Sequence, residues 1–309
     1  MNEKIHQLLA RYEKHIIGQT TNLRLLLCAI LSGGHVLLEG VPGTGKTKTV
    51  RTLADLLGGT FQRIQFTPDL LPSDITGSMI YNMKSGTFET LKGPVFTNIL
   101  LADEINRTPA KTQAALLEAM EEKQVTIQGK TYPLPTVFFV VATQNPLEFE
   151  GTYPLPEAQQ DRFLFKLIID FPSFEEEKRV LEQMITHASI AKEMAAVFSM
   201  ETFTTIKAEI EQVKVSDEIL AYILQIVRST RESETIRFGA STRAGIAIGK
   251  TAQVWAYMEG RDYVIPDDVK IVVKPSLRHR IQLSPHVELE GGTIDQAIEE
   301  LVGTTPVPR

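Results

Sequence analysis

The chain has 309 residues, which at about 150 residues per domain predicts one large domain or two of moderate size. With 43% hydrophobic and 23% charged residues the composition is globular, so a disordered, collagen-like or coiled-coil chain is excluded. Acidic residues outnumber basic ones by 38 to 32, and the net charge of −6 disfavours nucleic acid as the main partner, leaving room only for a local basic patch.

Cysteine content and hydropathy indicate the compartment. The single Cys28 can form neither an internal disulfide nor a zinc site made of several cysteines, which is typical of a reducing environment. No apolar run reaches the roughly 18 residues of a membrane-spanning helix, and the N-terminal segment is amphipathic and charged, unlike a signal peptide. We therefore expect a cytoplasmic protein without membrane insertion.

Hydrophobic periodicity predicts strands and helices in alternation through the first half of the chain. Helical spacing predicts that residues 4–31 are helical. The strands that follow are mostly apolar, as strands buried on both faces are, and the last is mixed enough for a sheet edge. These strands are predicted at residues 35–39, 61–66, 99–102, 137–142 and 163–169. Helices are predicted between them at 46–57 and 110–122. The pattern predicts an α/β fold with a five-stranded parallel sheet.

Two short alternating stretches interrupt this pattern. Each has β-prone residues on both sides of a turn signal, Ser85-Gly86 in the first and Gln128-Gly129 in the second. They predict β-hairpins inserted at about residues 76–89 and 123–134. Ordinary loops with some β character are the alternative.

Beyond about residue 172 only helical spacing is found. Helices are predicted at residues 175–190, 200–213, 216–230, 242–259 and 266–273, and no strand is predicted among them. The sequence therefore predicts an α/β domain over residues 1–172 and a smaller all-helical domain over residues 173–309.

A glycine-rich loop carries the most specific signal. It matches the phosphate-binding pattern G-x-x-x-x-G-K-[ST], follows a predicted strand and opens a predicted helix. Its residues are Gly40, Val41, Pro42, Gly43, Thr44, Gly45, Lys46 and Thr47. The glycines let main-chain N–H groups approach phosphate oxygens, and the helix adds its positive end. Lys46 is placed to reach the β- and γ-phosphates, and the Thr47 hydroxyl is placed to bind Mg²⁺.

Two adjacent carboxylates, Asp103 and Glu104, follow the predicted buried strand 99–102. The carboxyl ends of parallel strands open onto the crevice that also holds the phosphate loop, and two acids there are costly unless a cation balances them. We expect Asp103 to bind Mg²⁺ and Glu104 to orient and deprotonate the attacking water, which indicates ATP hydrolysis. An acid pair that merely caps the helix after Thr108 is the alternative.

Asn145 follows the predicted strand 137–142 and precedes Pro146. A neutral amide at this edge can hydrogen-bond both the water and the γ-phosphate without adding charge. A turn that begins at the Asn-Pro pair is the alternative.

These motifs, in the order GVPGTGKT, LLADEIN and ATQNP, resemble the AAA+ ATPases. The longer strings ADEINRTPAKTQAALLEAMEEKQVTI, ATQNPLEFEGTYPLPEAQQDRFLF and GASTRAG resemble the MoxR family in particular, and the likeness covers about residues 15–285. It implies Walker A at residues 40–47, Walker B ending at Asp103 and Glu104, and Asn145 as sensor 1. It also implies that the two hairpins are the helix-2 insert and the pre-sensor-1 insert. The family's element beside the adenine matches Ile17, Gly18 and Gln19.

Two arginines take their meaning from this resemblance. Arg162 matches the arginine finger, which reaches the γ-phosphate held by a neighbouring subunit, and an ion pair with Asp161 or another surface acid is the alternative. Arg243 lies in the first turn of a predicted helix, where a cation opposes the helix dipole. It matches the sensor 2 arginine that contacts nucleotide from the lid. Arg107 could also face a neighbour's nucleotide, although an ion pair on the helix surface is favoured.

The resemblance implies an Mg²⁺-dependent ATP hydrolase that binds ATP between its core and its lid and works as a ring, expected to be hexameric. Members of the family act as chaperone-like machines that remodel or activate protein partners, commonly with a protein that bears a von Willebrand factor type A domain. Two other classes stay open. One is a nucleic-acid-directed AAA+ motor, for which the hairpin tips offer only Lys84 and Lys130. The other is a magnesium-chelatase-like ATPase subunit that drives metal insertion.

Overall fold

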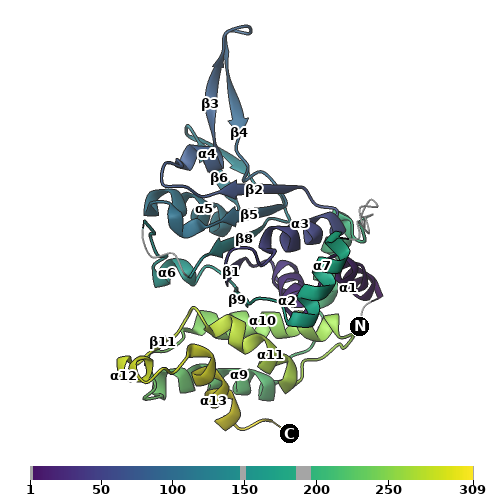
Figure 1. The fold of residues 1–309 in the computed structure, drawn as a ribbon, viewed down its shortest axis with the longest axis vertical. Helices are drawn as coiled ribbons and strands as arrows, with labels where there is room; N and C mark the ends of the chain where they lie inside the picture. Colours follow the sequence, from purple (N-terminus) through teal and green to yellow (C-terminus); the bar gives the residue numbers. More distant parts are fainter. Residues whose placement is uncertain (1–2, 147–150, 186–195, 309) are drawn as a thin grey trace.

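A five-stranded parallel sheet forms the centre of the first half of the chain (Figure 1). The computed structural model describes residues 3–146, 151–185 and 196–308. The sheet has the order β2-β5-β8-β1-β9, and every neighbouring pair is parallel, so the carboxyl ends of all five strands lie at one edge. The strands are β1 (Val36–Gly40), β2 (Phe61–Gln65), β5 (Ile99–Asp103), β8 (Phe139–Gln144) and β9 (Phe165–Ile169). The predicted α/β fold is confirmed, as is the edge position of the last strand.

Helices cover both faces of this sheet. Side chains alternate along β5, so Ile99 and Leu101 pack in one apolar cluster while Leu100 and Ala102 pack in another. The first cluster takes in α1 (Glu3–His15), α2 (Thr20–Leu31) and α3 (Lys46–Leu56), whereas the second takes in α5 (Ala110–Glu122). Burial on both faces explains why β5 and β8 are nearly continuous apolar runs.

The segment predicted to be helical, residues 4–31, forms two helices with a turn between them. Helix α1 ends at His15 and α2 begins only at Thr20, a break that the prediction did not include. Gly18, in the turn between them, has a φ of +79°, a left-handed conformation that ends a helix and favours glycine. Apolar spacing continues on both sides of the break, so periodicity alone did not reveal it.

Hairpins occupy both places where the sequence predicts them. The first is formed by β3 (Gly77–Asn82) and β4 (Thr87–Lys92), extends three residues beyond the predicted end at residue 89, and projects from the top of the molecule (Figure 1). Gly77 opens it at a φ of +104°, where an added Cβ would lie 2.3 Å from the Leu91 carbonyl oxygen. The second hairpin is formed by β6 (Gln124–Ile127) and β7 (Lys130–Pro133).

The second half of the chain is mostly helical. Its helices are α7 (Phe174–Ile185), α8 (Met200–Ile210), α9 (Asp217–Glu232), α10 (Thr242–Met258), α11 (Pro266–Leu277), α12 (Pro285–Leu289) and α13 (Ile294–Thr304). Residues 186–190 of the first predicted helix lie outside the described residues. The prediction that no strand occurs here is wrong, because β10 (Ile236–Phe238) and β11 (Gln282–Leu283) form an antiparallel pair too short to show a period. Three short helical segments complete the described chain: α4 (Pro72–Thr76), η1 (Ile105–Arg107) and α6 (Glu157–Gln160).

Helices α9, α10, α11 and α13 lie beneath β1 and β9, with α10 packed against α2 and α11 against β9 (Figure 1). Buried polar contacts fix this arrangement at the start of β9. The Arg280 guanidinium donates to the carbonyl oxygens of Phe163 and Leu164, at 2.7 and 3.1 Å, and its Nε lies 2.7 Å from Asp161 Oδ1. The helical half is therefore attached at the amino end of β9. This attachment determines how far Arg243 lies from the carboxyl edge of the sheet. Within the described residues, no helix has the length and apolar character needed to cross a membrane.

His35, directly before β1, is buried and neutral. Its Nδ1 accepts the Val140 N–H at 3.0 Å, which places the ring proton on Nε2, 3.3 Å from the Met120 carbonyl oxygen. Burial lowers the pKa of His35 to about 4. The ring therefore stays uncharged in the folded chain at pH values where it titrates in the unfolded chain.

Acid is expected to destabilise the fold through this histidine. The unfolded chain binds the proton near pH 6.5 and the folded chain only near pH 4, so stability present at pH 7 is lost as the pH falls through this interval. Between pH 7 and pH 5 the loss is about 2 kcal/mol for this one group. Urea unfolding of wild type and His35→Asn at both pH values measures this contribution. The difference in the free energy of unfolding between pH 7 and pH 5 should be about 2 kcal/mol smaller in His35→Asn than in wild type. Exchanging the exposed His6 for Asn should leave that difference unchanged.

Candidate active site

A hollow of about 420 Å³ opens at the carboxyl edge of the sheet. It is lined by the glycine-rich loop after β1 and by the ends of β2, β5 and β8. These segments come from four places in the sequence, and parallel strand order brings them together. Lys46, Asp103, Glu104 and Asn145 all line this one hollow, as the sequence predicts.

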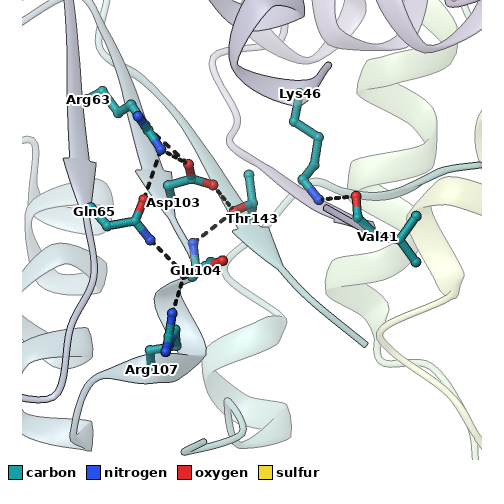
Figure 2. Close-up of polar contacts among 8 residues, drawn as sticks. All are labelled: Val41, Lys46, Arg63, Gln65, Asp103, Glu104, Arg107 and Thr143. Atoms are coloured by element: carbon teal, nitrogen blue, oxygen red, sulfur yellow. Dashed lines mark hydrogen bonds and ion pairs between the residues drawn. The ribbon is translucent and has the colours of Figure 1, made fainter. Parts of the chain in front are cut away.

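The loop wraps around its own lysine. Lys46 Nζ donates a hydrogen bond to the Val41 carbonyl oxygen at 3.0 Å (Figure 2), and it also donates to the Gly40 carbonyl oxygen. Gly43 and Gly45 take φ values of +86° and +79°, left-handed conformations that glycine permits at no steric cost. Helix α3 begins at Lys46 without an acidic residue in its first turn, so its N-terminal N–H groups keep their positive field. Burial lowers the pKa of Lys46, an effect that the carboxylates of Asp103 and Glu104 oppose.

Asp103 is buried and held at both oxygens (Figure 2). Its Oδ1 accepts the Thr143 hydroxyl at 2.6 Å, and its Oδ2 accepts Arg63 Nη2 at 2.6 Å and Arg63 Nε at 3.1 Å. A carboxylate that is 8% exposed needs such partners, because an unpaired charge in this position is expensive. The arrangement fixes the direction in which Asp103 faces.

Glu104 adopts a left-handed conformation, φ 57° and ψ 51°, directly after the strand. Its N–H donates to the Thr143 hydroxyl at 2.8 Å, so one threonine joins both acids. Its Oε2 accepts Gln65 Nε2 at 2.6 Å and Arg107 Nη1 at 3.0 Å (Figure 2). The ion pair that the sequence favours for Arg107 is therefore found, with Glu104 as its partner.

Arg63, Gln65 and Thr143 are site residues that the sequence reasoning missed. Arg63 and Gln65 flank the buried Ile64 on β2, and Gln65 pairs in register with Asp103. A polar–apolar–polar alternation on a strand was the available signal, but it carries information only once β2 is known to lie beside β5. Asn145, 7% exposed, follows β8 at the same edge.

The three residues expected beside the adenine line a second hollow of about 480 Å³. It lies between the turn that joins α1 to α2 and helix α7, which contributes Glu176 and Arg179. An added Cβ on Gly18 would lie 2.7 Å from the Glu176 carboxyl carbon, so the approach there is close. Helix α1 packs against α3, the helix that follows the phosphate loop, and at its end burial and then the Lys48 and Lys14 ammonium groups lower the pKa of His15. The residues concerned are Ile17, Gly18 and Gln19.

Arg162 and Arg243 lie at the opposite end of the sheet. The register pairs Val36 with Phe165 at one end and Gly40 with Ile169 at the other, so Arg162 precedes β9 at the edge away from the phosphate loop. A strand of this length spans roughly 16 Å. Arg162 pairs with Glu121 at 3.1 Å and Arg243 pairs with Asp161 at 3.3 Å.

Within one chain, the expectation for Arg243 is therefore not met. Arg243 does not reach the phosphate loop, and the helical half meets the nucleotide side of the core at α7, which lines the hollow at residues 17–19. All described residues that line the phosphate-loop hollow precede Pro146. The physical reason is the attachment of the helical half to the amino end of β9 through Arg280. Arg243 instead shares a hollow of about 160 Å³ with Arg162.

Comparison with known proteins agrees with this geometry. Residues 35–165 match the family described as ATPase family associated with various cellular activities (AAA), and residues 228–301 match the AAA lid domain. The chain is 45% identical to Chaperone MoxR1 of Mycobacterium tuberculosis, over 95% of this chain and 80% of that protein. It is 32% identical to Protein MoxR of Paracoccus denitrificans, over 95% and 93%. A crystal structure of a candidate ATPase from Cytophaga hutchinsonii has a TM-score of 0.92 at 45% identity and covers 99% of this chain and 95% of that one. A phosphate loop, two strand-end acids and a helical second half, in a chain with these relatives, show that the protein belongs to the MoxR family of AAA+ ATPases.

Proposed function

We propose that the protein is an Mg²⁺-dependent ATP hydrolase that works as a ring, expected to be hexameric, and remodels or activates a protein partner. The observation that carries the proposal is the single hollow in which the phosphate loop, Asp103, Glu104 and Asn145 meet. Family membership supports nucleotide as the ligand, and the name of the mycobacterial relative, a chaperone, supports a protein client.

The donor groups suit magnesium. Mg²⁺ prefers oxygen ligands and is usually bound by one or two carboxylates together with substrate phosphates and water. The Asp103 carboxylate and the Thr47 hydroxyl line the same hollow and supply such oxygens. When bound, the metal supplies positive charge against the phosphate oxygens.

The chain's own residues then divide the work. The loop N–H groups and Lys46 hold the phosphates, and the Glu104 carboxylate accepts a proton from the attacking water. Gln65 and Arg107 both contact Glu104 Oε2 and so set the orientation of this base. The Asn145 amide, neutral and at the same edge, hydrogen-bonds the water and the γ-phosphate.

The base and ribose of ATP extend from the phosphate loop toward the hollow at residues 17–19. Helix α7 forms the far wall of that hollow and lies directly after the proposed boundary between domains 1–172 and 173–309. A bound nucleotide therefore contacts α7, the segment that joins the two domains. Loss of that contact after hydrolysis would move the helical domain relative to the core.

Two arginines complete the site of a neighbouring subunit. Arg162 is the arginine finger, and because it lies a full strand length from its own phosphate loop, it acts across a subunit interface. Arg243 lies in the same hollow as Arg162, so the sensor 2 contact also crosses the interface in this proposal. A guanidinium suits both roles because it is permanently charged and offers a planar fork of donors.

The first hairpin is suited to a protein partner. It exposes six large apolar side chains, those of Met79, Ile80, Tyr81, Met83, Phe88 and Leu91. Such a surface favours a protein client, for which a von Willebrand factor type A domain protein is our candidate, over a nucleic-acid track or a tetrapyrrole-directed subunit. We also propose a cytoplasmic location. Cys28 is free and buried in the protein, and a lone reduced cysteine is typical of a reducing compartment.

Mixing two inactive variants tests the ring. Arg162→Ala is expected to bind ATP normally and to lose at least about 100-fold in assembly-dependent turnover, since an arginine finger contributes 10³ to 10⁵. Glu104→Gln retains its finger but lacks the base. Phosphate release from a mixture of the two should exceed that of either alone, because Glu104→Gln subunits supply fingers to intact pockets. Mixed rings, verified by mass, that recover no activity would contradict a finger acting in trans.

A further inference from the structure

Arg63 belongs to none of the recognised motifs, yet its guanidinium joins the residues around both acids (Figure 2). Its Nε and Nη2 donate to Asp103 Oδ2 at 3.1 and 2.6 Å, and Nη2 also donates to Gln65 Oε1 at 2.9 Å. Gln65 in turn donates to Glu104 Oε2 at 2.6 Å. A single side chain thus holds Asp103 directly and holds Glu104 through one intermediate.

Strand geometry explains why this side chain is available. Residues two apart on a strand point to the same side, so Arg63 and Gln65 both face the hollow while Ile64 packs in the core. Strand β2 is the edge of the sheet, and Gln65 lies in register with Asp103 on β5. The Arg63 stem needs only to cross to the neighbouring strand to reach the carboxylate.

The two Asp103 oxygens have different partners. A neutral hydroxyl, that of Thr143, contacts Oδ1, whereas the cation contacts Oδ2. A divalent metal and a guanidinium beside the same carboxylate oxygen repel each other strongly in a partly buried hollow. The two cations are therefore alternatives at Oδ2.

Arg63 also sets the direction of the Gln65 amide. An amide group has a donor end and an acceptor end, and the acceptor, Oε1, faces the Arg63 guanidinium. The donor, Nε2, consequently faces Glu104. The orientation of the amide depends on its hydrogen bond with Arg63. If the guanidinium moves away from Asp103, the hydrogen bond from Gln65 to Glu104 is weakened as well.

Resting on the proposed function, we infer that Arg63 is a positioning residue that balances the Asp103 charge when no metal is bound and competes with Mg²⁺ for Asp103 Oδ2. Without metal, the guanidinium supplies the positive charge that neutralises Asp103. When Mg²⁺ binds, the guanidinium must leave Asp103. Nucleotide affinity therefore depends less on Mg²⁺ than it would if Arg63 were absent.

The test compares nucleotide affinity with and without metal. Binding of a fluorescent ADP analogue is measured in EDTA and in Mg²⁺, and the ratio of the two Kd values gives the enhancement by metal. In Arg63→Met this enhancement should rise by about tenfold over wild type, the scale of a lost charge-assisted pair. Lys48→Met is the matched control, because it removes one positive charge from an exposed position in the same hollow.

Equal enhancement in wild type and Arg63→Met would overturn the inference. An equal rise in Lys48→Met would overturn it too, since net charge alone would then explain the effect. If wild type binds no nucleotide in either buffer, the proposed function itself fails, which is a distinguishable result.

Thermal unfolding in EDTA without nucleotide gives a second measurement. Arg63→Met should lower the melting temperature, because it leaves Asp103 buried without its counter-charge. Adding Asp103→Asn to that variant should restore most of the loss. If the two substitutions change the melting temperature additively, Arg63 does not balance Asp103 and the inference fails.

Discussion

Replacing Glu104 with glutamine is expected to leave ATP binding close to that of wild type and to reduce ATP turnover by at least about 100-fold. A general base contributes about 10² to 10⁴ in rate, and an amide of the same shape cannot accept the proton. The glutamine oxygen can still accept from Gln65 and Arg107, which lie 2.6 and 3.0 Å from Glu104 Oε2, so the hollow should keep its shape. Removal of a negative charge beside the phosphates gives no reason for weaker binding.

Phosphate release and fluorescent-nucleotide titration measure the two properties separately. Glu122→Gln, at the exposed end of α5, is the matched control and should behave as wild type in both. Turnover equal to wild type in Glu104→Gln would remove this residue from the mechanism. Loss of nucleotide binding would instead show that the contacts of Glu104 with Gln65 and Arg107 shape the part of the hollow that holds the nucleotide.

The part of the site that the sequence predicted depends on local motifs and on one rule of topology. The phosphate loop is a continuous segment whose glycines and lysine have fixed spacing, so its geometry follows from residues 40–47 alone. Asp103, Glu104 and Asn145 each follow an apolar strand. Because parallel strands end at a common edge, the sequence predicted that they meet at the loop, and they do.

The residues that sequence reasoning missed depend on which strands are neighbours. Arg63 contacts Asp103 only because β2 pairs with β5, although a hairpin and a helix separate the two strands in the chain. Strand order and register are set by packing of the whole sheet, and no local pattern around Arg63 reports them. The same holds for Gln65, whose partner Glu104 lies 39 positions further along.

The position of Arg243 was beyond sequence reasoning for a related reason. Its distance from the phosphate loop depends on how the helical half docks, which buried contacts such as that between Arg280 and the Phe163 carbonyl determine. Side-chain docking of one unit on another leaves no periodic signal. The pair β10 and β11 was missed because strands of three and two residues show no alternation, and the break at Gly18 was missed because apolar spacing resumes beyond it.

Replacing Lys46 with alanine is expected to weaken ATP binding by about 100-fold, the effect of losing charge-assisted hydrogen bonds to phosphate in a partly buried site. Fluorescent-nucleotide titration measures the affinity, and Lys111→Ala, on the exposed surface of α5, is the control that should bind as wild type. In the structure Lys46 contacts the loop carbonyl of Val41, so the melting temperature must be recorded as well to exclude collapse of the loop.

Lys46→Ala and Glu104→Gln together separate binding from chemistry. Lys46 contributes to nucleotide binding, whereas Glu104 acts in hydrolysis of the bound nucleotide. The first variant should therefore lose ATP affinity, and the second should lose only turnover. Unchanged ATP affinity in a stably folded Lys46→Ala protein would contradict the phosphate-loop assignment. Lys46 is the lysine of the loop at residues 40–47, and the other lysine that lines the described hollow, Lys48, is exposed on α3. The opposite pattern would be lost ATP affinity in Glu104→Gln and lost turnover alone in Lys46→Ala. It would contradict both assignments, because Lys46 lies at the start of α3 in the phosphate loop and Glu104 directly follows β5.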